Sequence, residues 1–294
     1  MMELSYAPLV PFMNERLPGM SPLRYRDWLF RDEAFGPQMA YRDRLLAAHP
    51  DVVVAGEGRR GAEELLDLVL ATLAAHDAGY QIGDAIAERP DGVLIPLDRD
   101  RPFATLGRLA QEDFLILDRG GDGGEHVLVG GVLCFPSRWS LTEKMNRPLS
   151  EVHDRVPAYD SQLAARVQRL FDGLTPERPL VRANWLVHSV NELHQPGSFS
   201  SASKPQEQTG RFWLRVERQA ILKLPQTGVA VFTVKTLLTP IEALHEDHRA
   251  GLIAALERQG SAMRDYHGGA AHSDAAIAAL RNLADGAAAN TPDR

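Results

Sequence analysis

The sequence predicts an α+β fold in which an antiparallel sheet of about five strands is flanked by helices. Two observations predict it. Short apolar runs separated by Gly, Pro and Asp turns fill the middle of the chain, as in antiparallel strands. Stripes with a period of 3.6 residues lie on either side of them, as in amphipathic helices. We divide the chain into a helical and irregular N-terminal arm packed on the core (1–110), the core (111–240) and a C-terminal helical extension with a frayed tail (241–294).

One clear helix is expected in the N-terminal arm, from Ala62 to Ala78. A single face carries five apolar side chains, as a helix packed on a core requires: Leu65, Leu66, Val69, Leu70 and Leu73. The preceding residues, 1–60, are rich in Pro, Arg and aromatic side chains. We expect them to form an irregular segment with short helical patches that wraps the core.

Five strands are expected in the core. The first hairpin joins 114–117 to 126–135 through a glycine-rich loop, and Pro136 ends its second strand because proline cannot donate to a ladder. The second hairpin joins 213–224 to 229–238 through the turn at 225–228. The remaining strand covers 182–188.

Four helical segments are expected after the first hairpin. Leu141 to Val152 must restart or kink at Pro148, and Asp160 to Phe171 carries one apolar side formed by Leu163, Val167, Leu170 and Phe171. After Pro240, helices are expected over 241–259 and about 273–284.

Composition excludes several function classes. The chain has 294 residues, of which 44% are hydrophobic, as is ordinary for a globular protein. Its formal net charge of -7 does not indicate nucleic-acid binding. No apolar run approaches the roughly 20 residues of a membrane span, and the N-terminus lacks the features of a secretory signal. The single cysteine, Cys134, excludes an internal disulfide and a cysteine-ligated cluster. We therefore expect a cytoplasmic protein.

Common catalytic motifs are missing as well. The sequence has no glycine-rich nucleotide-binding loop, no G-x-S-x-G elbow and no H-E-x-x-H helix. Any nucleotide or iron–sulfur cluster used in the reaction is therefore expected on another protein.

Three histidines and the cysteine are candidate metal ligands. His153 stands at a helix end before a proline, where its imidazole can point back toward the sheet, although spacing alone favours a structural or surface role. His188 and His194 compete with it, because a strand residue and a loop residue can both reach a pocket. Cys134 lies in an apolar run without a cationic neighbour in sequence, which favours a buried, inert thiol.

One strand face is unusually polar. Alternation places Arg215, Glu217 and Gln219 on one side of the strand 213–224 and Leu214, Val216 and Ala220 on the other. The polar side is either the solvent side of the strand or a pocket wall in which arginine binds an anion and glutamate binds a cation or moves a proton. Arg138 and Trp139, just after Pro136, allow the same two interpretations.

Four blocks of sequence, in the same order, resemble the haem-dependent oxidative N-demethylase family. They are LGRLAQEDFLIL (106–117), GGVLCFPSRWSLTEK with PLSEVH and VPAY (130–159), RANW (182–185), and LRVERQ with LP and VFTV (214–234). The resemblance extends from about Trp28 to about Pro240.

This resemblance implies a PAS-like sheet that holds haem b in the core. It implies a monooxygenase reaction in which a small secondary amine such as dimethylamine, O2 and two electrons give the demethylated amine, formaldehyde and water. The electrons would come from NADPH through separate reductase and ferredoxin-type subunits. A non-catalytic PAS-like module that binds haem or another small ligand as a sensor is the alternative.

The resemblance also implies roles for individual residues. His153 matches the histidine of the family's Val-His-x-x-Val-Pro block and is the expected axial iron ligand. Arg138, Arg218 and Trp139 are candidates for haem binding. Glu217 and Arg215 are candidates for catalysis, Glu217 as the carboxylate that holds the protonated amine or accepts its proton.

Overall fold

The computed structural model describes residues 10–13, 19–119, 124–154, 156–157, 159–197 and 210–289. Part of the predicted glycine-rich loop and the predicted frayed tail at 290–294 lie outside this range. The described residues form one seven-stranded antiparallel sheet, a small three-stranded sheet and helices, so the α+β prediction is confirmed.

The seven-stranded sheet has the order β1-β8-β9-β10-β6-β7-β2. Its five long strands are β6 (Asp113–Arg119), β7 (His126–Val132), β8 (Leu180–His188), β9 (Trp213–Lys223) and β10 (Ala230–Pro240). All five start within a few residues of their predicted positions. Two short strands from the N-terminal segment, β1 (Ser21–Pro22) and β2 (Val53–Val54), pair with β8 and β7 and cover the two edges.

The hairpin β9–β10 is the centre of this sheet. Its strands pair without interruption from Trp213↔Pro240 to Lys223↔Ala230, and the turn places Gly228 at φ 72°, a conformation that glycine adopts without strain. The continuous register fixes which side chains share a face. Arg215, Glu217 and Gln219 therefore lie on one side of the sheet, as predicted.

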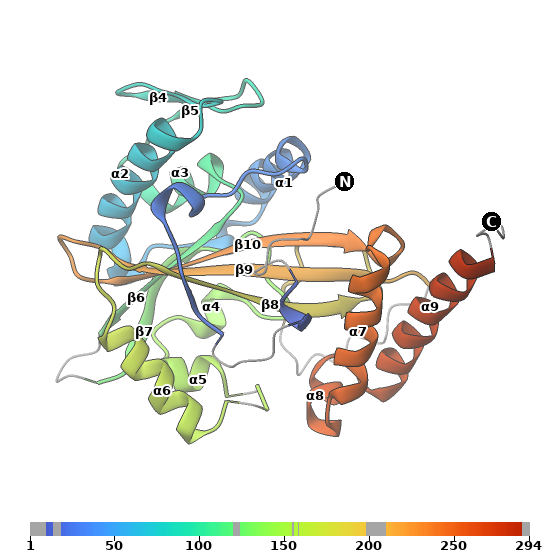
Figure 1. Cartoon of the computed structure of the whole chain (residues 1–294). Helices are drawn as coiled ribbons and strands as arrows, with labels where there is room; N and C mark the ends of the chain where they lie inside the picture. The colour runs from blue at the N-terminus through green and yellow to red at the C-terminus, as the bar shows by residue number, and fades with distance from the viewer. Residues whose placement is uncertain are drawn as a thin grey trace.

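Helices cover both faces of the sheet (Figure 1). The helices α1 (Phe35–Ala48), α2 (Arg59–His76) and α3 (Pro102–Leu109) pack on one face, and α4 (Leu141–Lys144), α5 (Leu149–Val152) and α6 (Ser161–Asp172) lie on the other. Pro148 separates α4 from α5, as predicted. Single 3-10 turns occur at Pro11–Met13, Tyr25–Asp27, Pro50–Val52, Gly56–Gly58 and Ile241–Ala243.

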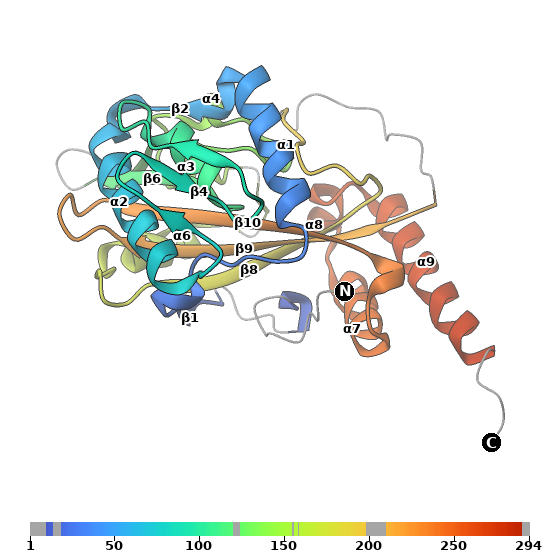
Figure 2. The same cartoon turned by 90° about the horizontal axis from the view of Figure 1, so that it is seen from above.

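The C-terminal helices gather at one end of the sheet. They are α7 (Glu246–Arg258), α8 (Ser261–Tyr266) and α9 (Ala270–Ala289), and in the view from above α9 projects away from the strands (Figure 2). Leu252 and Leu280 pack there against Leu214 and Leu237 of the central hairpin. The short helix α8 was not predicted from the sequence.

The largest apolar cluster lies between α1–α3 and the sheet. Trp28, Leu65 and Phe103 pack there against Phe114 and Ile116 of β6. The small sheet, β3 (Gln81–Ile82), β4 (Ile86–Glu88) and β5 (Leu94–Pro96), extends this layer beyond α2. No helix in the described part of the chain combines the length and apolarity needed to span a bilayer.

Candidate functional site

A cavity of about 590 Å³ lies on the sheet face that α4, α5 and α6 cover. Pockets for small ligands and cofactors usually have volumes of roughly 300–1,000 Å³. Its floor is formed by strands β6, β8, β9 and β10, and its walls by the segment from β7 to α6 and by α8. The polar face of β9 is thus buried under a cavity, and its interpretation as the solvent side of the strand is wrong.

One part of the cavity is apolar, because α6 turns its hydrophobic side toward the sheet. All four predicted side chains line the cavity: Leu163, Val167, Leu170 and Phe171. The helix begins at an N-cap in which the Asp160 carboxylate accepts a hydrogen bond from the backbone N–H of Leu163 at 2.8 Å.

His153 lines the cavity from the end of α5, where it is half-buried. Its Nδ1 lies 2.9 Å from the backbone carbonyl oxygen of Leu149, and because a carbonyl only accepts, Nδ1 carries the proton. The ring stacks on Tyr159 with 4.5 Å between centroids. Burial lowers the pKa of His153, so the imidazole is neutral at pH 7 and Nε2 keeps its lone pair. Metal-bound histidines commonly have this arrangement, with one nitrogen bonded to a carbonyl group.

His188 lines the cavity from the end of β8 and is buried, with 3% of its surface exposed. Its Nε2 has no hydrogen-bond partner among the described residues. Burial and the nearby cations Arg215 and Arg138 hold the pKa of His188 well below its usual range. His188 is therefore a second neutral imidazole with an unpaired nitrogen at the cavity.

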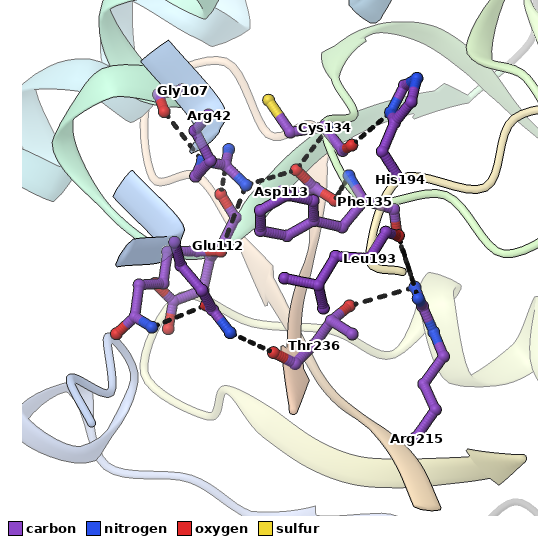
Figure 3. A network of polar contacts seen from close by, with 12 residues as sticks. Arg42, Gly107, Glu112, Asp113, Cys134, Phe135, Leu193, His194, Arg215 and Thr236 are labelled. Carbon is purple, nitrogen blue, oxygen red and sulfur yellow. Dashed lines mark hydrogen bonds and ion pairs between the residues drawn. The ribbon is translucent and has the colours of Figure 1, made fainter. Parts of the chain in front are cut away.

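Glu217 and Arg215 form an ion pair in the middle of β9, with 3.0 Å between Arg215 Nε and Glu217 Oε1. Glu217 lines the cavity, whereas Arg215 is fully buried behind it. Arg215 also donates to the backbone oxygens of Phe135 (2.7 Å) and Leu193 (3.1 Å) (Figure 3). Arg215 therefore does not line the cavity itself but fixes Glu217 and ties two chain segments together, which makes it a positioning residue.

Arg138 and Trp139 both line the cavity, as the pocket interpretation predicts. Arg138 has a left-handed backbone with φ 60°, which costs a residue with a Cβ about 1–2 kcal/mol. Its N–H donates to the Gln195 carbonyl at 2.8 Å, and this bond holds the turn. Burial lowers the pKa of Arg138, with Tyr266 acting in the opposite direction. Such strain is concentrated at functional sites.

Arg218 is not brought to the cavity. Alternation along β9 places it on the opposite face, where its guanidinium donates to the backbone carbonyls of Trp28 (2.8 Å) and Asp27. It ties the N-terminal segment to the sheet and is not among the residues that line the cavity.

His194 and Cys134 also lie outside the cavity lining. His194 donates from Nδ1 to the Cys134 carbonyl oxygen at 2.7 Å (Figure 3). The thiol of Cys134 is fully buried, and burial raises its pKa to about 12, although the Arg42 guanidinium acts in the opposite direction. The thiol is therefore protonated at pH 7, as the inert-thiol interpretation predicts.

Other lining residues were missed by the sequence analysis. Arg182 and Asn184 of β8 share the floor with Glu217, and the Nε of Arg182 is buried without a partner among the described residues. Met263, Tyr266 and His267 reach the cavity from α8. The alternation of β8 could have identified Arg182 and Asn184, but no sequence signal connects α8 to a cavity whose floor is formed by the preceding strands.

The cavity combines neutral imidazoles, arginines and an apolar wall, which together suit an anionic cofactor with a large apolar surface. Comparison with known families gives a direct result: residues 19–277 match the model of the family described as haem-dependent oxidative N-demethylase, alpha subunit-like. The chain belongs to this family. The match extends beyond the predicted limit at Pro240 and includes α7, α8 and part of α9, so the helix that closes the cavity belongs to the family region.

The described residues fit a haem-dependent member of this N-demethylase family. Haem held by a histidine needs an imidazole with an unprotonated nitrogen, together with cationic groups for its propionates and an apolar enclosure. His153 meets the first requirement, Arg138 and Arg182 meet the second, and the α6 side of the cavity meets the third. The described residues contain no cluster of three or more His, Cys, Asp or Glu side chains that could hold a metal ion by themselves.

Proposed function

We propose that this protein is the haem-b-binding subunit of a monooxygenase that removes a methyl group from a small secondary amine such as dimethylamine. The observation that carries the proposal is His153, a neutral imidazole at the cavity whose Nδ1–H is bonded to a carbonyl group. In the proposed reaction a secondary amine, O2, two electrons and two protons give the demethylated amine, formaldehyde and water.

The proposal includes a PAS-like core. Among the five long strands, the first and last along the chain, β6 and β10, lie side by side at the centre, and the segment with α4–α6 crosses one face. This arrangement supports a PAS-like sheet with its ligand between the strands and the crossing segment.

His153 would hold the iron through Nε2, and Arg182 and Arg138 would face the propionates. When bound, the haem would supply the activation of O2 that oxidises the methyl carbon. Trp139 and the apolar side of α6 would exclude water from this space. The electrons would come from NADPH through separate subunits, since the family is named for an alpha subunit and this chain has no nucleotide-binding or cluster motif.

Glu217 would bind the protonated amine and accept its proton. Of the three acidic side chains that line the cavity, Glu143 and Asp154 are exposed, whereas the side chain of Glu217 is only 14% exposed. Arg215 holds its carboxylate at 3.0 Å, so the substrate meets a fixed acceptor.

Turnover tests this function. The purified chain is loaded with hemin and supplied with dimethylamine, O2 and electrons from NADPH through an added reductase and ferredoxin, and formaldehyde is measured. The proposal expects formaldehyde from the wild type and from His76→Ala, a change at an exposed histidine, and at least about a hundredfold less from Glu217→Gln. Stable haem binding without formaldehyde would favour the sensor alternative over the enzyme.

A further inference from the structure

The end of the cavity next to α8 is built differently from the rest. Four lining residues meet there, Arg138, His188, Tyr266 and His267, and we call them the α8 end. His188 is 3% exposed, and its Nε2 is a buried polar atom without a partner among the described residues. In the tautomer that carries the proton on Nε2, this atom is a buried donor without a partner, and a ligand that accepts from it gains affinity.

The electrostatic balance of the α8 end is positive. Arg138 and Arg215 are both close enough to act on His188, and Arg138 also acts on His267. The pKa values of both imidazoles are lowered, first by the burial of each ring. Arg215 and Arg138 lower the pKa of His188 further, and Arg138 lowers that of His267 further. The half-buried acid of the cavity, Glu217, is already paired with Arg215. Beside Arg138, on the side away from Glu217, an anionic group would therefore be stabilised.

A carboxylate is an anion that side chains of these types can bind. Its two oxygens can accept paired hydrogen bonds from a guanidinium group, a geometry that arginine favours. A neutral imidazole can donate from Nε2, and a phenol from its hydroxyl. The same ligand would thus use Arg138, His188 and Tyr266 together.

Tyr266 connects the α8 end to the candidate amine-binding group. Its phenol interacts electrostatically with Glu217 and with Arg138, which act on it in opposite directions. A molecule that carries a cationic amine and a carboxylate could therefore meet Glu217 with one group and Arg138 with the other.

We propose that the α8 end is a carboxylate-binding subsite in which Arg138 and His188 recognise a ligand's carboxylate group. Two ligands carry this group, an N-methylated amino acid as substrate and a propionate of haem. The proposal rests on the proposed function, and it would make the substrate class a zwitterionic methylated amine in the first case.

Calorimetric titration separates the two sources. The whole chain is titrated with N-methylglycine, with dimethylamine, with hemin and with hemin dimethyl ester, whose propionates are uncharged. Arg138→Gln and His188→Leu are compared with the wild type and with Arg178→Gln, which makes the same change at an exposed arginine outside the cavity. Circular dichroism and thermal melting check that each variant is folded. The two substitutions lie in separate segments of the chain, so the proposal can still be tested with one variant if the other misfolds.

A substrate subsite raises the Kd for N-methylglycine at least tenfold in both variants, about 1.4 kcal/mol, leaves the Kd for dimethylamine unchanged in both, and leaves the Kd for hemin unchanged in His188→Leu. A propionate subsite raises the Kd for hemin by the same factor and leaves that for its ester unchanged. Arg178→Gln should change neither.

The subsite is overturned if the folded variants bind N-methylglycine and hemin within about twofold of the wild type, or if the wild type neither binds N-methylglycine nor prefers hemin to its ester. If the wild type binds neither hemin nor its ester, the proposed haem function fails. The titration with N-methylglycine then decides the subsite alone.

Discussion

The two faces of the central sheet both bury charged side chains, but they satisfy them differently. On the α1–α3 face, fully buried Arg42 donates to Asp113 at 2.7 Å and to the backbone carbonyls of Gly107, Gln111 and Glu112 (Figure 3). On the cavity face, His188 Nε2 and Arg182 Nε are buried without partners in the described part of the chain. The first face is a closed structural network, and the second offers polar atoms to a ligand.

The comparison shows why burial of a charge alone does not identify a site. Lys235, on the α1–α3 face, is fully buried and lies 3.3 Å from Asp32 and 2.9 Å from Gln111. Burial raises the pKa of Glu112 in the same region, but nearby Lys235 and Arg218 oppose the shift. Strong electrostatic perturbation there accompanies complete pairing. Unpaired donors around a cavity are the more specific signal.

The largest effect is expected from opening the closed network. Asp113 accepts from Arg42 and from the backbone N–H groups of Cys134 (2.7 Å) and Phe135 (3.0 Å). Asp113→Ala leaves a buried guanidinium unpaired and should lower the free energy of unfolding by about 3–5 kcal/mol in urea titration. Arg99→Ala breaks the exposed pair with Asp67 and should cost less than about 1 kcal/mol. Equal losses in the two variants would contradict the contrast.

On the cavity face, a smaller effect on stability is expected when the pH of the solution falls. Burial first, then Arg138 and His272, lower the pKa of His267 to about 4 in the folded protein, against about 6.5 in the unfolded chain. The unfolded state therefore binds more protons between these values, and this stabilisation is present above about pH 6.5 and lost as pH falls toward 4.

Between pH 7 and pH 5 we expect the haem-free protein to lose about 1–2 kcal/mol through His267. His267→Gln should reduce that pH dependence, which urea titrations at the two pH values would measure. An unchanged pH dependence in the variant would show that His267 is not held neutral.

A substitution in α6, which covers the cavity, should change the free energy of unfolding independently of substitutions in the closed network. Asp160→Ala removes the N-cap of α6, and we expect a loss of about 1 kcal/mol in the free energy of unfolding. Combined with Asp113→Ala, the two losses should add, because the residues share no partner. A coupling energy well above about 0.5 kcal/mol would show that the two faces are linked.

The smallest effect on stability is expected at the unpaired imidazole. His188→Leu removes a buried polar atom that has no partner, so the haem-free protein should keep its stability within about 1 kcal/mol or gain slightly. Urea titration beside Asp113→Ala makes the comparison directly. A loss approaching that of Asp113→Ala would mean that His188 is structural.

The sequence was sufficient to predict the elements that have a strong local pattern. The five long strands, the apolar side of α6 and the break at Pro148 follow from alternation, helical period and proline chemistry. The common face of Arg215 and Glu217 followed from the same alternation. Its burial did not, because alternation cannot show whether a polar face meets solvent or a cavity.

What the sequence could not predict depends on long-range packing. The resemblance placed Arg218 with the haem-binding residues, although its position one residue after Glu217 puts it on the other face. The strand β1 has two residues and α8 has six, too few for a periodic pattern. The contribution of Tyr266 and His267 arises only when the C-terminal helices fold back on the sheet.

The absorption spectrum of the hemin-titrated protein tests most directly whether His153 holds haem on the cavity face. The account predicts a Soret band that saturates at one hemin per chain in the wild type, is lost or strongly shifted in His153→Ala, and returns when free imidazole is added to that variant. His76→Ala should behave as the wild type does. A wild type that gives no Soret band, or a normal band in His153→Ala without imidazole, would contradict it.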